Sequence, residues 1–287
     1  MRRRGLLPVA LAVLGVAALA AAVAALAAQH GGRAAAQRAA SPPCEPPLPG
    51  NHPVTFGTAR PALLLHVPTA APQGRRPLVL VLPGAGMTGT DMAHATGYAR
   101  LADRDNFLVA YPTASGTWPA WNVSTRGPDD VGYLRRVIRA LTGNAACADP
   151  GRVGVTGLAD GARMSVLLAC RAPGLVAAVA PVTSSTLPGC RPARPLPLLE
   201  IHPPGGAAGS SLAAWRATDA CSAAARRRSP ARNVRERRWR CGDGALVVDD
   251  RVVDPAHAWP GGPSLKPFSA TAATWAFLSA FRAAQRS

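Results

Sequence analysis

The chain has 287 residues, with 32 Lys and Arg against 15 Asp and Glu, so its formal net charge is +17. Lys266 is the only lysine, and arginine therefore carries nearly all of the excess charge. The sequence has no zinc-finger spacing, no CxxC pair, no aromatic and basic platform and no repeat, so we expect no nucleic-acid partner, no metal and no cofactor.

The N-terminal segment has the order of an export signal. Met1-Arg2-Arg3-Arg4 precedes an uncharged run from Gly5 to Ala28, in which Ala25-Leu26-Ala27 offers a cleavage site of the small-x-small type. The run is also long enough to span a bilayer, so residues 1–28 are predicted to be either a cleaved signal peptide or an N-terminal membrane anchor. Both alternatives place the following residues outside the cytoplasm, secreted or held at the outer face of the cytoplasmic membrane. Residues 29–53, rich in Ala and Pro, are predicted to be a linker.

From residue 54 to residue 287, apolar strand-like runs alternate with helical patterns. Strands are predicted at Ala62–Val67, Pro77–Leu82, Phe107–Tyr111, Arg152–Thr156, Val176–Val182, Leu196–Ile201 and Leu246–Val253, and helices at Asp91–Asp105, Asp129–Leu141 and Ala270–Phe281. This alternation indicates a single α/β domain with a mostly parallel central sheet and helices on both faces. Loops at the carboxyl ends of such strands are where functional residues are expected.

One of these strands runs into Gly157-Leu158-Ala159-Asp160-Gly161 and then into a helical stretch. A sharp strand-to-helix turn with the pattern G-x-S-x-G is the nucleophile elbow of serine hydrolases. The middle residue here is Ala159, whose methyl group cannot attack a substrate. The segment is either an elbow without its nucleophile or an ordinary turn with glycines, and its place after a buried strand favours the elbow.

The six cysteines form an even set in a chain that is predicted to be exported: Cys44, Cys147, Cys170, Cys190, Cys221 and Cys241. Disulfides are therefore expected. Cys221 and Cys241 flank an arginine-rich segment, Arg226–Arg240, and are predicted to pair. That segment is expected to be a solvated excursion closed by the disulfide, and the alternative is a face that binds an anionic envelope surface.

Four segments resemble the extracellular poly(3-hydroxybutyrate) depolymerase and feruloyl esterase family of α/β-hydrolases, within a resemblance that spans most of residues 54–285. "RPLVLVLPGAGMTG" resembles the family's strand and oxyanion loop, and "DDVGYLRRVIRAL" resembles the next helix. "RVGVTGLADGARMSVLLAC" is similar to the elbow and its helix, and "HAWPGG" is similar to the segment that carries the catalytic histidine. The resemblance implies an α/β-hydrolase fold, a retained histidine position at His257, and an oxyanion loop with donors at Ala85 and Asp160.

The sequence departs from the family at three positions of the catalytic machinery. Ala159 stands where the family has its serine, and Pro83 stands where the oxyanion loop has a histidine. No Asp or Glu lies between Glu200 and Asp219, although the family has its acid there in an H-G-x-x-D segment. Ester hydrolysis needs the serine, a histidine base and the acid that orients it.

Three functional hypotheses follow from these departures. The leading one is a homologue without hydrolase activity whose cleft still binds an ester or an acylated polymer. The second is an active carboxylic-ester hydrolase that uses other residues, and the third is an envelope protein that acts through Arg226–Arg240. Trp118, Trp121 and Trp259 are predicted either to line a substrate groove or to pack in the core.

Overall fold

The computed structural model describes residues 47–56, 60–70, 74–183, 187, 189–205, 208–253, 258–262 and 268–283. The predicted signal or anchor, most of the linker and His257 lie outside these ranges. The described residues belong to one compact unit. None of their helices is long and apolar enough to cross a bilayer.

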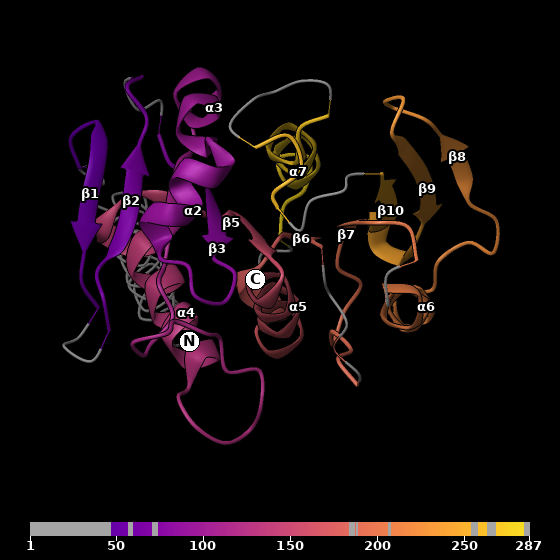
Figure 1. Cartoon of the computed structure of the whole chain (residues 1–287), viewed down its shortest axis with the longest axis horizontal. Helices are drawn as coiled ribbons and strands as arrows, with labels where there is room; N and C mark the ends of the chain where they lie inside the picture. The colour runs from indigo at the N-terminus through magenta and orange to yellow at the C-terminus, as the bar shows by residue number, and fades with distance from the viewer. Residues whose placement is uncertain are drawn as a thin grey trace, which may run out of the picture. The chain divides into compact units, whose positions relative to one another are not determined.

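Ten strands of the described unit form one sheet in the order β1-β2-β4-β3-β5-β6-β7-β10-β9-β8 (Figure 1). The strands are β1 (Gly50–Val54), β2 (Leu63–Val67), β3 (Arg76–Leu82), β4 (Leu108–Tyr111), β5 (Ala148–Leu158), β6 (Ala178–Val182), β7 (Leu198–His202), β8 (Arg226–Arg228), β9 (Val234–Arg240) and β10 (Leu246–Val252). The central strands β4, β3, β5, β6, β7 and β10 are parallel, while β1, β2, β9 and β8 pair antiparallel at the two ends. The carboxyl ends of the parallel strands therefore meet at one edge of the sheet.

Helices cover both faces of the sheet. They are α2 (Gly89–Thr96), α3 (Tyr98–Asp105), α4 (Asp130–Ala140), α5 (Asp160–Arg171), α6 (Ala208–Thr218) and α7 (Ala270–Leu278). Alternate residues of β3 point to opposite faces, so Leu80 packs in a core with α4, α5 and α6, whereas Val79 packs in a second core with α2, α3 and α7. The predicted fold class, a mostly parallel sheet with helices on both faces, is confirmed.

The prediction of one helix over Asp91–Asp105 is wrong, because Gly97 divides it into α2 and α3. Gly97 has φ 64° and ψ 23°, and its amide donates to the carbonyl of Ala93. This left-handed conformation ends α2, and glycine adopts it without the strain that a Cβ brings. The short α2 begins with a capping box formed by Thr88 and Asp91.

The arginine-rich segment is not simply a solvated excursion, because most of it is sheet. β8 and β9 extend the sheet beyond β10, at the orange end of the sheet in Figure 1. Val234 and Trp239 of β9 are buried in the two cores, whereas Arg235 and Arg240 are exposed. The strand β9 was not predicted, because arginines occupy its exposed and half-buried positions and its sequence therefore has no apolar run.

Candidate active site

Ala159 lies at the turn between β5 and α5, at the carboxyl edge of the sheet. Its backbone has φ 48° and ψ −103°, a combination that is strained for a residue with a Cβ. The amide of Ala159 donates to the carbonyl of Val182 at 3.0 Å and to the hydroxyl of Thr183 at 3.2 Å, both at the end of β6. The turn therefore has the strand–turn–helix form that a nucleophile elbow requires.

The two glycines that bracket this turn are needed for close backbone packing. A Cβ on Gly157 would lie 2.5 Å from the carbonyl group of Gly161, and a Cβ on Gly161 would overlap the carbonyl oxygens of Leu82 and Pro83. The turn is thus pressed against the end of β3, where the oxyanion loop begins. This packing explains the G-x-x-x-G spacing and favours the elbow over an ordinary turn.

The loop after β3 brings backbone donors to the same edge. The amide of Gly86 donates to the carbonyl of Pro119 at 2.7 Å, and the Trp121 indole donates to the carbonyl of Pro83 at 2.9 Å. The amide of Ala85, by contrast, has no acceptor among the described residues. Asp160 is the first residue of α5, so its amide has no acceptor within the helix. Amides that are left unused in two touching loops are the kind of donors that an oxyanion hole uses.

The Asp160 side chain is committed to a structural contact. Its carboxylate accepts the backbone amide of Trp121 at 2.6 Å, which ties the start of α5 to the loop that follows β4. Neither Ala159 nor Asp160 thus offers a hydroxyl or thiol to a substrate.

The carboxyl end of β7 holds a buried histidine, His202. Nε2 of His202, the last residue of β7, lies 2.6 Å from Oδ1 of Asp249 in β10. Burial alone would lower the pKa of His202, but the hydrogen bond that His202 donates to Asp249 and the charges of Glu200 and Asp249 raise it above its usual value. Burial alone would raise the pKa of Asp249, but the contacts with His202 and Arg237 lower it. The Asp249 carboxylate is therefore already engaged with His202 and with two arginines, Arg237 and Arg251.

Sequence reasoning missed two carboxylates with raised pKa values. Burial and the charges of Glu236 and Asp249 raise the pKa of Asp250 to about 7. Burial raises the pKa of Asp219 to about 6, while its carboxylate accepts the amide of Leu196 at 3.0 Å. For Asp250 the sequence held a signal, since two adjacent acids interrupt the apolar run of Leu246–Val253.

The structure separates the three predicted groove tryptophans. Trp118 is 72% exposed, and its ring lies against Gly86 in the oxyanion loop. Trp121 is 4% exposed and Trp259 is 3% exposed, and the Trp259 indole donates to the hydroxyl of Thr271 at 2.8 Å. Trp121 and Trp259 thus have the packing role that was the alternative, and of the three only Trp118 presents its ring to solvent.

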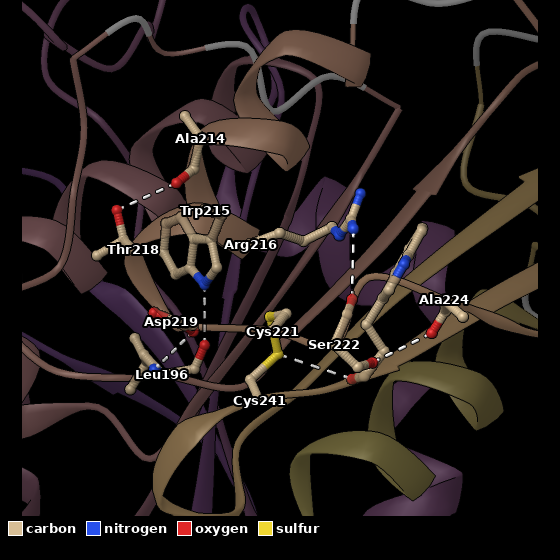
Figure 2. The surroundings of a disulfide bond; sticks show 11 residues. Leu196, Ala214, Trp215, Arg216, Thr218, Asp219, Cys221, Ser222, Ala224 and Cys241 are labelled. Carbon is tan, nitrogen blue, oxygen red and sulfur yellow. Dashed lines mark hydrogen bonds between the residues drawn. A yellow bond between two sulfur atoms is a disulfide. The ribbon is translucent and has the colours of Figure 1, made fainter.

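The predicted Cys221–Cys241 disulfide is present and closes the segment that contains β8 and β9. Figure 2 shows it beside Trp215 and Asp219. A second disulfide joins Cys170 to Cys190, and Cys147 is also disulfide-bonded. Disulfides persist in oxidising compartments, which agrees with export.

This strand order, with a strained turn between a central strand and a helix, defines an α/β-hydrolase. Two solved esterases share the fold. An acetyl xylan esterase from Aspergillus awamori matches with a TM-score of 0.57 and 17% identity, over 74% of this chain and 95% of that one. A thermostable esterase matches with a TM-score of 0.52 and 18% identity, over 77% of this chain and 59% of that one.

Within that class, residues 62–189 match the family described as Esterase PHB depolymerase. A putative esterase, NocK, from Nocardia uniformis subsp. tsuyamanensis is 35% identical over 144 residues, or 46% of this chain and 40% of that protein. A poly(3-hydroxybutyrate) depolymerase from Ralstonia pickettii is 33% identical over 122 residues, or 38% of this chain and 25% of that protein. A probable acetylxylan esterase A from Aspergillus fumigatus is 35% identical over 111 residues, or 36% of this chain and 29% of that protein.

The alignment with these three relatives spans two fifths or less of their length. The match to the family ends at residue 189, before β7 begins at Leu198. The family resemblance is therefore confirmed for residues 62–189, which include the loop after β3 and the turn at Ala159. For the segment that contains His257, and for the loop after His202, it stays a prediction.

Proposed function

We propose that this chain is an exported member of the esterase fold class that binds an ester or an acylated polymer without hydrolysing it. The observation that carries the proposal is Ala159, which occupies the strained turn between β5 and α5 and has only a methyl side chain. Acyl transfer on this fold needs a nucleophile at that turn, a base to deprotonate it and a carboxylate to orient the base. In this proposal His257 keeps the position of the base without a serine to act on.

Three features support retained binding at this edge. The amides of Ala85 and Asp160 are candidate donors to a substrate carbonyl oxygen. Trp118 offers a flat, exposed ring beside the oxyanion loop. The named substrates of two relatives, poly(3-hydroxybutyrate) and acetylxylan, are both polymers with ester groups, which is why we infer an acylated polymer as the ligand.

The proposal also covers the parts of the chain outside the described residues. Residues 1–28 act as a signal peptide or an N-terminal anchor. The linker predicted over residues 29–53 ends at residue 49, because β1 begins the hydrolase-like domain at Gly50. The disulfides of the described part support an extracellular location or one at the outer face of the membrane.

The test separates turnover from binding. The purified protein is expected to release no p-nitrophenol from p-nitrophenyl acetate or butyrate above a buffer control. It is expected to bind acetylated xylo-oligosaccharides in calorimetry, and the deacetylated oligosaccharides serve as the matched control. Turnover that is abolished by His257→Ala would overturn the proposal and identify an active esterase with a different nucleophile. Equal affinity for acetylated and deacetylated chains would rule out the ester group as the ligand.

A further inference from the structure

An open pocket of about 600 Å³ lies where β8 and β9 extend the sheet beyond β10. Five arginines line it: Arg227, Arg228, Arg235, Arg237 and Arg251. Pro204, which follows the carboxyl end of β7, contributes to the same wall. The pocket is therefore separate in its residues from the elbow at Ala159 and from the oxyanion loop.

The register of the strands forces these arginines together. Arg227 lies directly opposite Arg237 in the pairing of β8 with β9, and Arg235 lies directly opposite Arg251 in the pairing of β9 with β10. Like charges directly opposite each other destabilise a sheet. Negative charge at this face, from carboxylates or from a bound anion, would relieve the repulsion.

The nearby carboxylates balance only part of this charge. Asp249 forms ion pairs with Arg237 and Arg251, and it also binds His202. Glu236 is paired with Arg228 and also with Arg238, which does not line the pocket. Asp249 and Glu236 are thus shared with groups outside the pocket, and the five guanidinium groups keep an excess of positive charge.

The ion pairs also hold several guanidinium groups in place. Asp249 accepts both Nε and Nη2 of Arg237, at 2.7 and 2.6 Å. Glu236 accepts Nε of Arg228 at 3.0 Å, and the carbonyl of Arg232 accepts Nη1 of Arg235 at 3.3 Å. Within the described residues, these contacts leave outer N–H groups of Arg228 and Arg235 without an acceptor. Arginine donors that are already oriented and carry an excess of positive charge can bind an anion with little loss of side-chain freedom.

We propose that this pocket binds the phosphate group of an organic ligand, through Arg227, Arg235 and Arg251. The planar fork of arginine matches phosphate oxygens in a bidentate manner, and a phosphate dianion neutralises more of the excess charge than one carboxylate. The volume lies within the range of organic ligands and exceeds the need of a bare ion. Pro204 and the exposed Val253 supply apolar surface for the rest of such a ligand.

The first experiment compares two double variants that remove the same charge from the same two strands. Arg227→Gln with Arg235→Gln removes two pocket arginines, whereas Arg226→Gln with Arg240→Gln removes two exposed arginines that do not line the pocket. Calorimetry with inorganic pyrophosphate and with glycerol 3-phosphate measures binding, and thermal unfolding checks that each variant is folded. The pocket variant is expected to bind about tenfold more weakly or worse, because it loses charged hydrogen bonds. The control variant is expected to stay within about twofold, since its two exposed arginines do not line the pocket and their charge is screened by solvent and salt.

A second set of measurements distinguishes a soluble organic phosphate from a lipid headgroup. Flotation with vesicles of phosphatidylglycerol, against vesicles of phosphatidylcholine, tests the lipid. Binding to the anionic vesicles that pyrophosphate displaces, and that only the pocket variant loses, identifies the headgroup. Soluble phosphate binding without vesicle binding identifies a soluble ligand. The proposal is overturned if both double variants lose binding equally, since the charge would then act diffusely, or if the unaltered protein binds none of these probes.

Discussion

The imidazole of His202 and the carboxylate of Asp249 form a buried pair across two neighbouring parallel strands, with Nε2 and Oδ1 2.6 Å apart. The two residues are 47 positions apart in the sequence, and only the pairing of β7 with β10 brings them together. The Asp249 carboxylate is therefore used to fix a strand pair. It is not available in this arrangement to orient a second histidine.

This pair predicts a pH-dependent stability. Because folding raises the pKa of His202, the pair adds to the free energy of unfolding in full below the usual histidine pKa of 6.5. This stabilisation is lost as the pH rises through the raised pKa. Because folding lowers the pKa of Asp249, its stabilisation of the folded protein is complete above the usual aspartate pKa of 3.8. This stabilisation is lost as the pH falls through the lowered pKa. His202→Gln should therefore destabilise the protein most between about pH 4 and pH 6.5, and less at about pH 9. Denaturant unfolding at these pH values measures the difference. His94→Gln, at an exposed histidine, is the control, and an equal loss at all pH values would contradict the assignment.

The elbow predicts the outcome of restoring an oxygen at residue 159. Ala159→Ser should give only slow acylation by an activated ester or a serine-directed organophosphate, detected as a mass increase on the intact protein. Without an acid to fix the histidine tautomer, a loss of roughly four orders of magnitude relative to a complete triad is expected. Ala159→Gly tolerates the positive φ and lacks the hydroxyl, so it controls for the change of backbone and should not react. Turnover near the enzyme median of about 10 per second would instead mean that a carboxylate supports His257, and Glu200 would be the first to replace.

Close packing at the elbow predicts an unusual effect of a glycine-to-alanine change. Gly161 lies in the first turn of α5, where alanine is intrinsically better than glycine by about 1 kcal/mol. The added Cβ would nevertheless meet the carbonyls of Leu82 and Pro83, so Gly161→Ala should destabilise the protein by about 1–3 kcal/mol. Gly174→Ala is the matched control, because its Cβ would meet nothing within 4 Å, and it should change stability by less than about 0.5 kcal/mol. Similar midpoints of urea unfolding for the two variants would show that β3 does not hold the elbow as described.

The two described disulfides allow a comparison at equal loop length. Cys170–Cys190 and Cys221–Cys241 both have a sequence separation of 20. The chain-entropy model therefore predicts the same loss, about 3 kcal/mol, when either pair is replaced by serines. Unfolding of the two double variants in denaturant measures each loss. A much larger loss for the 221–241 pair would show that it also holds the buried contacts of Trp215 and Asp219 next to it, beyond constraining the unfolded chain.

The sequence predicted the parts of the fold that depend on local pattern. Apolar runs predicted the buried parallel strands, and glycines between a predicted strand and a predicted helix located the elbow. The Ala-rich helix α6 was missed because its sequence has no clear polar and apolar periodicity, and β1 was missed because Asn51, His52 and Pro53 interrupt it. Contacts such as His202 with Asp249 depend on strand order, which no short segment of sequence contains.

The candidate site was predictable to a similar extent. The glycine spacing located the turn at Ala159, but the sequence did not reveal that the Asp160 side chain would bind the amide of Trp121. Nor could composition divide the tryptophans into two buried rings and one exposed ring, because burial depends on how distant loops pack. The pocket in the arginine-rich segment could not be predicted, because the register of β8, β9 and β10 in the sheet determines which arginines line it.

The two ends of the described sheet have a bearing on how copies of this protein behave at high concentration. An outermost strand exposes unpaired backbone groups to which another chain can add a strand, and this addition is a route to aggregates. At one end β8 consists only of three exposed arginines, so a second copy of β8 laid against it would set six guanidinium groups in one ladder. At the other end β1 contains Pro53, which has no amide hydrogen to donate. The charge of β8 and the proline of β1 thus oppose the pairing of edge strands between copies of the protein. Lowering the charge of β8, or screening it with salt, should promote such pairing.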